Sequence, residues 1–418
     1  MPDDTKRRVL ISGTGIAGPV TAYWLAHHGW EVTMIERARS LRLDGQNIDL
    51  TDAARDVVDR MGLMEAIRSR HTGERGMQFV EPDGSVAAEF SVDKEGSMTR
   101  EIEILRGDLV ELLVEGLPRE VELRFDASIE SIEAIGKAGD GDAEPVRVRF
   151  NDSREEEYDL LVVADGMNSH TRRMVFPDRD GEDYLGCWAS YFTIPRLASD
   201  TDWWRWYTSS NGIVAFLRPD NQGTMRASVN FLSEDNDPPR MSLEDKRRRL
   251  QDRLRGSGWE CDRIADALDD VDDLYLGPLC QIKLQRWSRG RCVLVGDAGY
   301  CPTPYTGMGT TLAVIGGYVL AGELSTADNI PAGLQSYEER LGGFVRDSQK
   351  LPPGVPDIAY ARSRLKTELI NRSAGLVAST PAQVLLSTLK NLTGKQDQNR
   401  FDLPNYAVSS SASTDSGV

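Results

Sequence analysis

The chain has 418 residues, a length that allows two or three domains, and its formal net charge of −17 argues against a nucleic-acid partner, because phosphates would be repelled. Its five cysteines and four histidines show no C-x-x-C, H-x-x-x-H or H-E-x-x-H spacing, so we expect reduced thiols and no metal site. The sequence shows neither a signal peptide nor an apolar run of about twenty residues, which predicts a cytoplasmic protein without a membrane partner.

The first predicted element is a short apolar strand that runs into the glycine pattern G-x-G-x-x-G. Gly13 allows a tight strand-to-helix turn, Gly15 lets a pyrophosphate approach the backbone, and Gly18 lets helix and strand pack closely. The helix N-terminus then faces the phosphates. A second apolar strand ends at Glu36, whose carboxylate would accept hydrogen bonds from a ribose diol. Strand, glycines, helix and carboxylate in this order predict a dinucleotide-binding βαβ unit.

Three further features follow along the chain. Residues 77–91 alternate apolar and polar side chains around an Asp-Gly pair, which predicts a hairpin. Arg106 stands at the start of a predicted helix, where it is either solvated or binds an anion. A buried strand then ends at Asp165 and Gly166. Because ligands of a doubly wound sheet lie beyond the carboxyl ends of its strands, this turn is a candidate binding position, although an Asp-Gly turn without a ligand is also common.

The composition changes between residues 186 and 232, where β-type segments rich in tryptophan follow one another. This pattern predicts an antiparallel sheet inserted into the first domain, and charged helical sequence follows at 242–268. The tryptophans either pack in the core of the sheet or form the floor of an apolar pocket for a flat ligand.

The chain then returns to the first domain. A buried strand ends at Asp297, and a glycine-rich turn at Gly307 and Gly309 opens a long apolar helix whose N-terminus can face an electron-rich ligand atom. Residues 351–406 are typical of helices separated by proline. The polar, low-complexity residues 407–418 are typical of a disordered tail.

Three separated motifs therefore accumulate, and together they resemble the single-component FAD-dependent aromatic hydroxylases with the para-hydroxybenzoate hydroxylase fold. The resemblance covers about residues 8–350. It includes the glycine turn with Glu36 and Arg37, the Asp-Gly turn at Asp165, and the stretch from Asp297 through Pro304. Two positions depart from the family pattern. Tyr300 stands where the family usually has histidine, and Thr311 stands where asparagine or aspartate is frequent.

The resemblance implies an α/β fold: a Rossmann-like FAD-binding domain, an inserted antiparallel-sheet substrate domain and a C-terminal helical segment. We expect the FAD-binding domain at 1–180 and 272–350 and the substrate domain at 181–271, with the hairpin 77–91 joining the substrate sheet. The C-terminal helical segment is then 351–406 and the tail 407–418. The resemblance leads us to expect no separate nicotinamide domain.

In enzymes of this kind, NAD(P)H reduces FAD, O2 adds to the reduced ring as a C4a-hydroperoxide, and one oxygen atom passes to an electron-rich carbon. The resemblance therefore implies a monooxygenase that hydroxylates or epoxidises a polycyclic aromatic or polyketide-like small molecule, in secondary metabolism or antibiotic inactivation. No catalytic side chain is required, because the flavin supplies the reactivity. The inserted sheet would shield the hydroperoxide from water.

The candidate site residues follow from the motifs and from the resemblance. For FAD they are Gly13, Gly15, Ile16, Ala17, Gly18, Glu36, Arg37, Gln46, Arg106, Asp165, Gly166, Asp297, Pro304, Gly307 and Gly309, with Asn47 beside Gln46 near the flavin edge. For the substrate they are Tyr191, Trp206, Phe216 and Met225.

Two alternatives remain open. A flavin-dependent halogenase of the same superfamily is one, since Trp203-Trp204-Arg205-Trp206 is similar to part of its G-W-x-W-x-I-P motif, although the Gly, Ile and Pro are absent. A non-catalytic flavoprotein that carries or senses a ligand is the other, and the changes at Tyr300 and Thr311 would allow it. The protein is expected to be a monomer or a homodimer.

Overall fold

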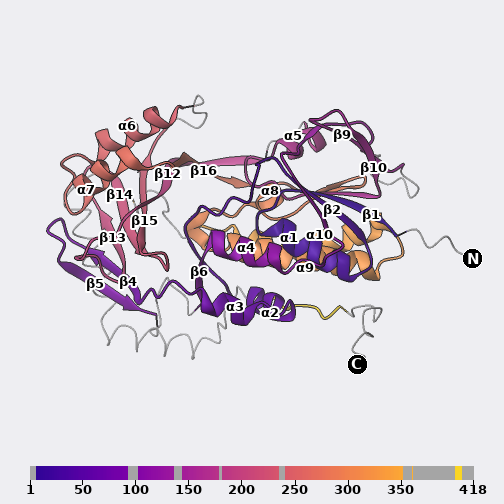
Figure 1. Ribbon diagram of the computed structural model, residues 1–418, viewed down its shortest axis with the longest axis horizontal. Coiled ribbons are helices and arrows are strands. Elements are labelled where there is room, and N and C mark those ends of the chain that lie inside the picture. Colours follow the sequence, from indigo (N-terminus) through magenta and orange to yellow (C-terminus); the bar gives the residue numbers. More distant parts are fainter. Residues whose placement is uncertain are drawn as a thin grey trace, which may run out of the picture.

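The computed structural model describes residues 6–92, 102–135, 144–177, 181–234, 241–351, 360 and 401–406. Most of the predicted C-terminal helical segment and the whole predicted tail at 407–418 lie outside the described residues. The described part is elongated, with a mainly parallel sheet and its helices at one end and a mainly antiparallel sheet at the other (Figure 1). The chain is therefore a mixed α/β protein with two sheet-based parts.

A six-stranded sheet forms the core of the first part. In sheet order its strands are β17 (Ser288–Arg289), β18 (Cys292–Leu294), β11 (Leu160–Val163), β1 (Arg8–Ser12), β2 (Glu31–Glu36) and β7 (Glu122–Phe125). All neighbours are parallel except β17 and β18. β1 lies near the centre, and its apolar side chains are buried because other elements cover both faces of the sheet. The carboxyl ends of β1, β2, β11 and β18 therefore share one edge.

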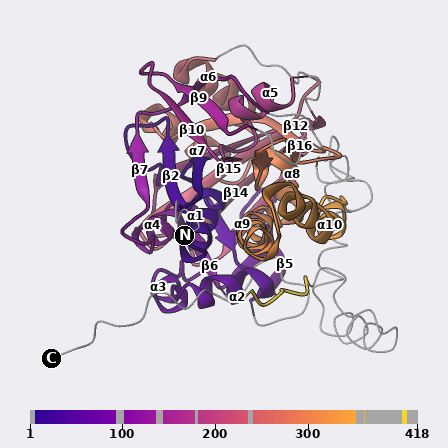
Figure 2. The same cartoon turned by 90° about the vertical axis from the view of Figure 1, so that its right-hand side faces the viewer.

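Most helices of the first part lie on one side of this sheet (Figure 1). The helices of this part are α1 (Ala17–His27), α2 (Asp52–Arg60), α3 (Met64–Ser69), α4 (Arg106–Glu115), α5 (His170–Val175), α8 (Asp297–Tyr300), α9 (Gly309–Thr326) and α10 (Ile330–Ser348). Helix α9 packs against both α1 and α10 (Figure 2) and is buried along most of its length. In the described parts of the chain, no helix combines the length and apolar character needed to cross a membrane.

Two small sheets complete the first part. One has the order β10 (Glu155–Tyr158), β9 (Val146–Phe150) and β8 (Ile129–Ile132). The other is a ribbon of β3 (Asn47–Asp49) and β6 (Glu103–Leu105), in which Asp49 lies opposite Glu103. This ribbon lies between the six-stranded sheet's helices and the second part of the molecule (Figure 1).

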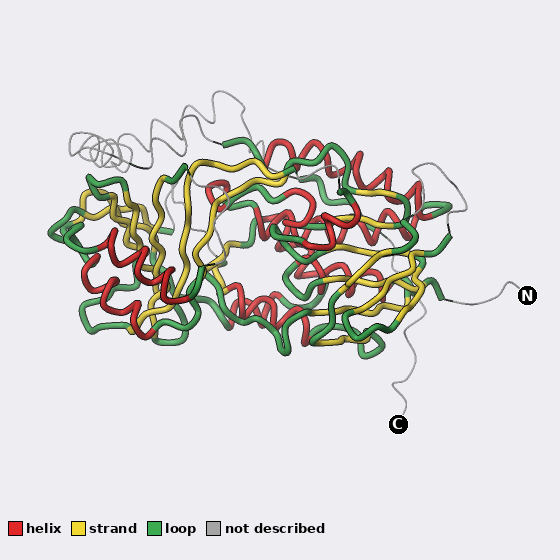
Figure 3. The backbone as a smooth tube through the Cα atoms, turned by 90° about the horizontal axis from the view of Figure 1, so that it is seen from above, coloured by secondary structure: helices red, strands yellow, loops and turns green. Residues whose placement is uncertain are grey.

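A seven-stranded sheet forms the second part. Its order is β16 (Tyr275–Ile282), β12 (Glu182–Pro195), β15 (Thr224–Leu232), β14 (Ile213–Pro219), β13 (Trp204–Thr208), β4 (Gly76–Val80) and β5 (Val86–Ser91). The hairpin β4–β5 joins it through a parallel pairing with β13. The sheet also extends past residue 271, because β16 pairs with β12. These two long strands run side by side toward the first part (Figure 3).

The two faces of the seven-stranded sheet have different partners. One face packs against α6 (Leu243–Leu254) and α7 (Cys261–Ala267) through a core that includes Phe192, Leu217 and Ala227. The other face carries a separate apolar cluster. Because successive side chains of a strand point to opposite faces, the pairing register decides which residues belong to which cluster.

Candidate functional site

The glycine turn after β1 shows a different requirement at each glycine. Gly13 has a φ of +111°, and a Cβ there would lie 2.5 Å from the carbonyl oxygen of Ala164. A Cβ on Gly18 would lie 2.0 Å from the carbonyl oxygen of Gly13. A Cβ on Gly15 would meet nothing nearer than a guanidinium nitrogen of Arg106 at 3.7 Å. Gly13 and Gly18 therefore serve packing, whereas Gly15 leaves open space beside the backbone of the kind that a pyrophosphate needs.

Glu36, at the end of β2, is oriented by the same turn. One carboxylate oxygen accepts a hydrogen bond from the Thr14 hydroxyl at 2.9 Å, and the other accepts one from the backbone N–H of Ala38 at 2.9 Å. A carboxylate has about four acceptor positions. The remaining acceptor capacity is available to a diol.

A cleft of about 470 Å³ lies at this edge of the sheet and brings the first two motifs together. Seven of the predicted residues line it: Gly13, Gly15, Glu36, Arg37, Arg106, Asp165 and Gly166. Asp165 accepts hydrogen bonds from the hydroxyl of Ser169 and from the backbone N–H of Thr171, so it organises the start of α5. A Cβ on Gly166 would meet nothing within 4 Å, and its φ of +88° favours glycine.

Arg106 connects this cleft with the third motif. It is the first residue of α4, and its guanidinium donates to the backbone carbonyl of Asp44 at 3.3 Å. Its backbone N–H donates to the carbonyl of Gln46 at 3.0 Å, which fixes the loop that precedes β3. Burial lowers the pKa of Arg106, while the carboxylate of Asp297 favours its charged form. A cation in this position can bind an anionic group.

The third motif folds around Asp297, the first residue of α8. Burial raises the pKa of Asp297, and nearby Arg106 opposes that shift. A Cβ on Gly309 would lie 4.0 Å from an Asp297 carboxylate oxygen, so Asp297 lies beside the start of α9. Gly307 adopts a φ of +64°, which closes the turn that begins at Pro304. The motif therefore places an acidic side chain and a helix N-terminus next to each other.

Two predicted cofactor residues, Ile16 and Ala17, are not among those that line the cleft. Ile16 precedes α1 as its N-cap residue, and Ala17 is the first residue of the helix. The methyl group of Ala17 leaves no room for a side chain at Gly296, because a Cβ there would lie 2.9 Å away. Ala17 therefore brings the first and third motifs into contact.

The two departures from the family pattern point into the protein. Tyr300 is 1% exposed, and its hydroxyl is 2.8 Å from that of Tyr337 on α10. The hydroxyl of Thr311 on α9 is 2.8 Å from that of Thr51, just before α2. Tyr300 therefore links α8 to α10, and Thr311 links α9 to the residue that precedes α2.

Three of the four predicted substrate residues belong to the cluster on the face away from α6 and α7. Trp206 and Phe216 stack with their ring centroids 5.4 Å apart and their planes at 16°, and Tyr191 packs in the same cluster. Met225 lies on the opposite face, fully buried in the core beneath α6 and α7. The register explains this, since Met225 pairs with Pro219 and shares the face of Leu217, not that of Phe216.

Tyr305, next to Pro304, reaches the same cluster from the third motif. Its hydroxyl hydrogen-bonds with that of Tyr360 and lies 3.5 Å from the sulfur of Cys187 on β12. The third motif and the aromatic face of the seven-stranded sheet are therefore in direct contact.

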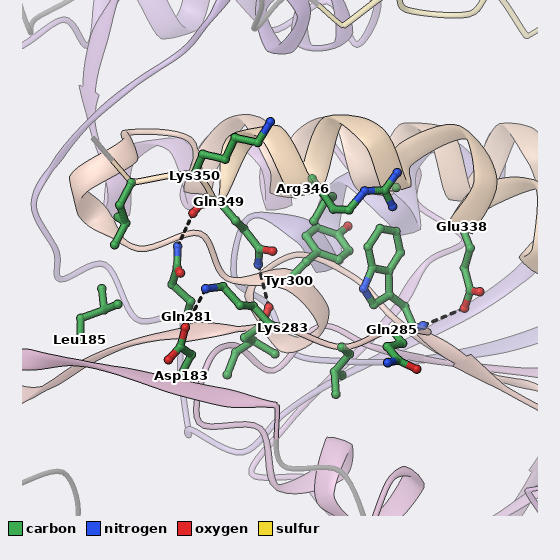
Figure 4. A pocket seen from close by; sticks show the side chains of 16 residues that line it. Asp183, Leu185, Gln281, Lys283, Gln285, Tyr300, Glu338, Arg346, Gln349 and Lys350 are labelled. Atoms are coloured by element: carbon green, nitrogen blue, oxygen red, sulfur yellow. Dashed lines mark hydrogen bonds and ion pairs between the residues drawn. The ribbon is translucent and has the colours of Figure 1, made fainter. Parts of the chain in front are cut away.

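A second cavity, of about 700 Å³, is lined by residues of β16 and α10 and by Tyr300 of α8 (Figure 4). Gln281 and Gln349 both line this cavity. The side chain of Gln281 donates to the backbone carbonyl of Gln349 at 2.8 Å, and the side chain of Gln349 donates to the backbone carbonyl of Ile282 at 2.7 Å. These bonds attach the end of α10 to β16. None of the predicted cofactor or substrate residues lines this cavity.

Several residues that line the cleft belong to none of the predicted motif positions. They are Ser12, Thr14, Ile35, Arg42, Ala127, Ser128, Ile129, Glu130, Asn151, Ala164, Asn168, His170 and Thr171. Thr14 occupies a variable position of the glycine pattern, and Ser128 and Asn151 come from loops with no motif of their own. Only tertiary structure brings them together.

The chain matches a family model described as an FAD binding domain over residues 6–346. A flavin-dependent monooxygenase of Legionella longbeachae is 33% identical over 406 residues, which cover 96% of this chain and 99% of that protein. The FAD-dependent monooxygenase asL6 of Sarocladium schorii is 31% identical over 422 residues, covering 96% and 98%. Among solved structures, tetracycline destructase Tet(55) is similar with a TM-score of 0.77 and 30% identity, covering 96% and 99%.

Proposed function

Because the chain belongs to the family of FAD-dependent monooxygenases, we propose that it uses NAD(P)H and O2 to hydroxylate or epoxidise a polycyclic aromatic or polyketide-like small molecule. The observation that carries the proposal is the contact between the third motif and the aromatic face, which Tyr305 makes through Tyr360 and Cys187. Such a contact supports a cofactor held at Asp297 beside a substrate held on that face. The role is in secondary metabolism or antibiotic inactivation.

The residues of the cleft fit FAD. Gly15 leaves space for the pyrophosphate, Glu36 has acceptor capacity for the ribose diol, and Arg106 supplies positive charge. Asp297 and the N-terminus of α9 fit the ribityl chain and the pyrimidine side of the ring. When bound, FAD supplies the redox chemistry, accepting electrons from NAD(P)H and activating O2.

The aromatic face is the part of the site that we propose binds the substrate and excludes water. Tyr191, Trp206 and Phe216 offer flat apolar surface on which a fused-ring substrate can stack. The same surface excludes water from the reacting atoms, which limits loss of the activated oxygen as H2O2. Tetracycline is a suitable first candidate, because a structural relative at 30% identity is named a tetracycline destructase.

The test is an assay of the purified protein loaded with FAD. We expect NADPH or NADH to bleach the flavin absorbance, faster with tetracycline or a polycyclic phenol than without it, and the product to gain one oxygen atom by mass spectrometry. Bound flavin that neither nucleotide reduces would instead favour the non-catalytic flavoprotein. A product that gains chlorine in the presence of chloride would favour the halogenase.

A further inference from the structure

A buried cluster of charged side chains lies where the ribbon β3–β6 meets the seven-stranded sheet. Arg218 on β14 donates through Nε to Glu74 at 2.9 Å and through one terminal nitrogen to both Glu74 at 3.2 Å and Glu103 at 2.7 Å. The side chains of Glu74, Glu103 and Arg218 are 0%, 1% and 9% exposed. The three residues come from the loop before β4, from β6 and from β14, so they join both parts of the molecule.

Arg218 is shared between two buried carboxyl groups. Asp49 lies directly opposite Glu103 on the ribbon and acts electrostatically on all three members of the cluster. Two buried carboxyl groups, those of Glu74 and Glu103, thus share one guanidinium. Burying an uncompensated carboxylate is costly, and two carboxylates that share one site cannot both ionise easily. Burial raises the pKa of Glu74 well above its ordinary value and also raises the pKa of Glu103, while Arg218 opposes both shifts. Hydrogen bonding with Asn47 and Glu74 further opposes the shift of Glu103.

Two buried acceptor atoms indicate where a proton is held. Both oxygens of Glu74 accept from Arg218, whereas only one oxygen of Glu103 does. The second oxygen, Glu103 Oε2, has no hydrogen-bond partner, and neither has Asn47 Oδ1 on the adjacent strand. A proton on Glu103 Oε2 turns one of these acceptors into a donor for the other. We propose that Glu103 is a protonated positioning residue, which holds Arg218 and, through it, the aromatic face that binds the substrate.

The connection to the aromatic face runs through Trp204. The Arg218 guanidinium lies 4.2 Å from the centroid of the Trp204 ring, within the range of a cation–π contact. Trp204 in turn contacts both Trp206 and Phe216, each with ring centroids 5.6 Å apart. Ionisation of Glu103 adds a negative charge beside Arg218. It therefore changes the cation–π contact between Arg218 and Trp204, and through Trp204 the position of Trp206 and Phe216. This step rests on the proposed function, in which Trp206 and Phe216 carry the substrate.

The pH dependence of stability has a defined sign. A carboxyl whose pKa is raised by folding binds its proton more tightly in the folded state, so stability falls as the pH rises from the unfolded pKa to the folded pKa. One such group changes the unfolding equilibrium constant by up to about tenfold per pH unit in that window. The window begins near the ordinary glutamate pKa of about 4.3 and extends upward.

The experiment compares Glu103→Gln with Glu74→Gln in the full chain. The amide of Glu103→Gln imitates the protonated acid, so we expect near-normal stability and loss of the Glu103 contribution to the pH slope in denaturant unfolding. Glu74→Gln places an NH2 group against the N–H groups of Arg218 and should be markedly less stable while keeping the slope. Glu89→Gln is the matched control, because Glu89 is an exposed carboxylate of the same sheet that accepts from Gln78 at 2.8 Å.

Infrared spectroscopy reads the proton directly. At about pH 7 exposed carboxyls are ionised, so the spectrum of the unmodified protein minus that of Glu103→Gln should contain the C=O band of a protonated acid. The same difference taken with Glu89→Gln should lack it. Absence of the band, or an unchanged pH slope in Glu103→Gln, overturns the proposal. If Glu74→Gln alone is stable and loses the slope, the assignment to Glu103 is wrong.

Near-ultraviolet circular dichroism tests the positioning role. We expect the tryptophan signal to change with pH in step with the loss of stability, and to be constant in Glu103→Gln. The pH-dependent part should disappear in Trp204→Phe. A signal that does not follow the pH overturns the link to the aromatic face. None of these measurements depends on turnover, so a protein that fails to oxygenate any substrate but gives these results would refute only the proposed function.

Discussion

The glycines of the turn after β1 divide into two that the fold needs and one, Gly15, that we propose leaves room for the cofactor. The sequence pattern predicted that all three glycines belong to a dinucleotide-binding turn. Only the structure separates their roles, because the spacing of the pattern does not show which atoms would surround a Cβ at each position. Gly13 and Gly18 face backbone atoms, whereas Gly15 faces open space. Substitutions at the three positions therefore have different consequences.

Gly15→Val should fold normally and bind FAD at least about a hundredfold more weakly, equivalent to losing two hydrogen bonds to charged phosphate. Gly13→Ala should instead lower the free energy of unfolding by more than about 2 kcal/mol, because its Cβ would clash with Ala164 in a conformation with positive φ. Flavin titration and denaturant unfolding check the pair. A Gly15→Val protein that keeps the original FAD affinity would contradict our placement of the pyrophosphate.

Arg106 offers a second test at the residue scale. Arg106→Met keeps an apolar stem beside Gly45 but removes the charge, so we expect little change in stability and roughly tenfold to hundredfold weaker FAD binding. Binding of FAD should also lose part of its dependence on salt, measured as affinity against ionic strength. A loss of stability equal to the loss of affinity would show that the charge serves the fold.

At the scale of elements, strand register decides what the sequence could predict. Alternation along β14 and β15 is hidden because both faces are buried, so apolar residues such as Phe216 and Met225 look equivalent in the sequence. The hairpin and the motif-bearing strands were predictable, since their glycines and turns are local signals. The cleft residues on other loops and the position of β16 were not, because they depend on pairing across long sequence separations.

Because Met225 and Phe216 lie on opposite faces of the seven-stranded sheet, we expect their substitution to have different effects. Met225→Ala should destabilise the protein by about 2–5 kcal/mol with an almost unchanged KM, because it leaves a cavity in the core under α6 and α7. Phe216→Ala should raise the KM for an aromatic substrate several-fold, because the stacked pair with Trp206 is lost. Unfolding curves and steady-state kinetics distinguish them. Equal effects on KM would place both residues on one functional surface.

At the scale of the whole molecule, the two parts are joined by polar contacts as well as by β12 and β16. Arg218 bonds Glu103, and Asn47 donates to the carbonyl of Pro219 at 2.9 Å. The junction therefore combines a continuous pair of strands with a buried charged cluster. Composition and charge could not predict it, since the residues that bond one another across the junction are more than a hundred positions apart in the sequence.

Arg218→Met should be among the most destabilising single changes, lowering the free energy of unfolding by about 3–5 kcal/mol, because it leaves buried carboxyl groups without a counter-charge. The loss should be larger at alkaline pH, where those groups ionise. Chemical denaturation at several pH values measures it. Replacement of Arg196, which pairs with Asp202 near the surface, is the control and should cost less than about 1 kcal/mol.

The packing of Tyr300 also constrains how this sequence could have diverged. A Cβ on Gly316 would lie 2.0 Å from the Tyr300 hydroxyl, so tyrosine at the first position requires glycine at the second. A chain with a smaller side chain at position 300 needs glycine at position 316 before tyrosine at position 300, because the opposite order passes through an intermediate with a steric clash. Among relatives, the two positions should therefore covary, with tyrosine found only where the helix carries glycine.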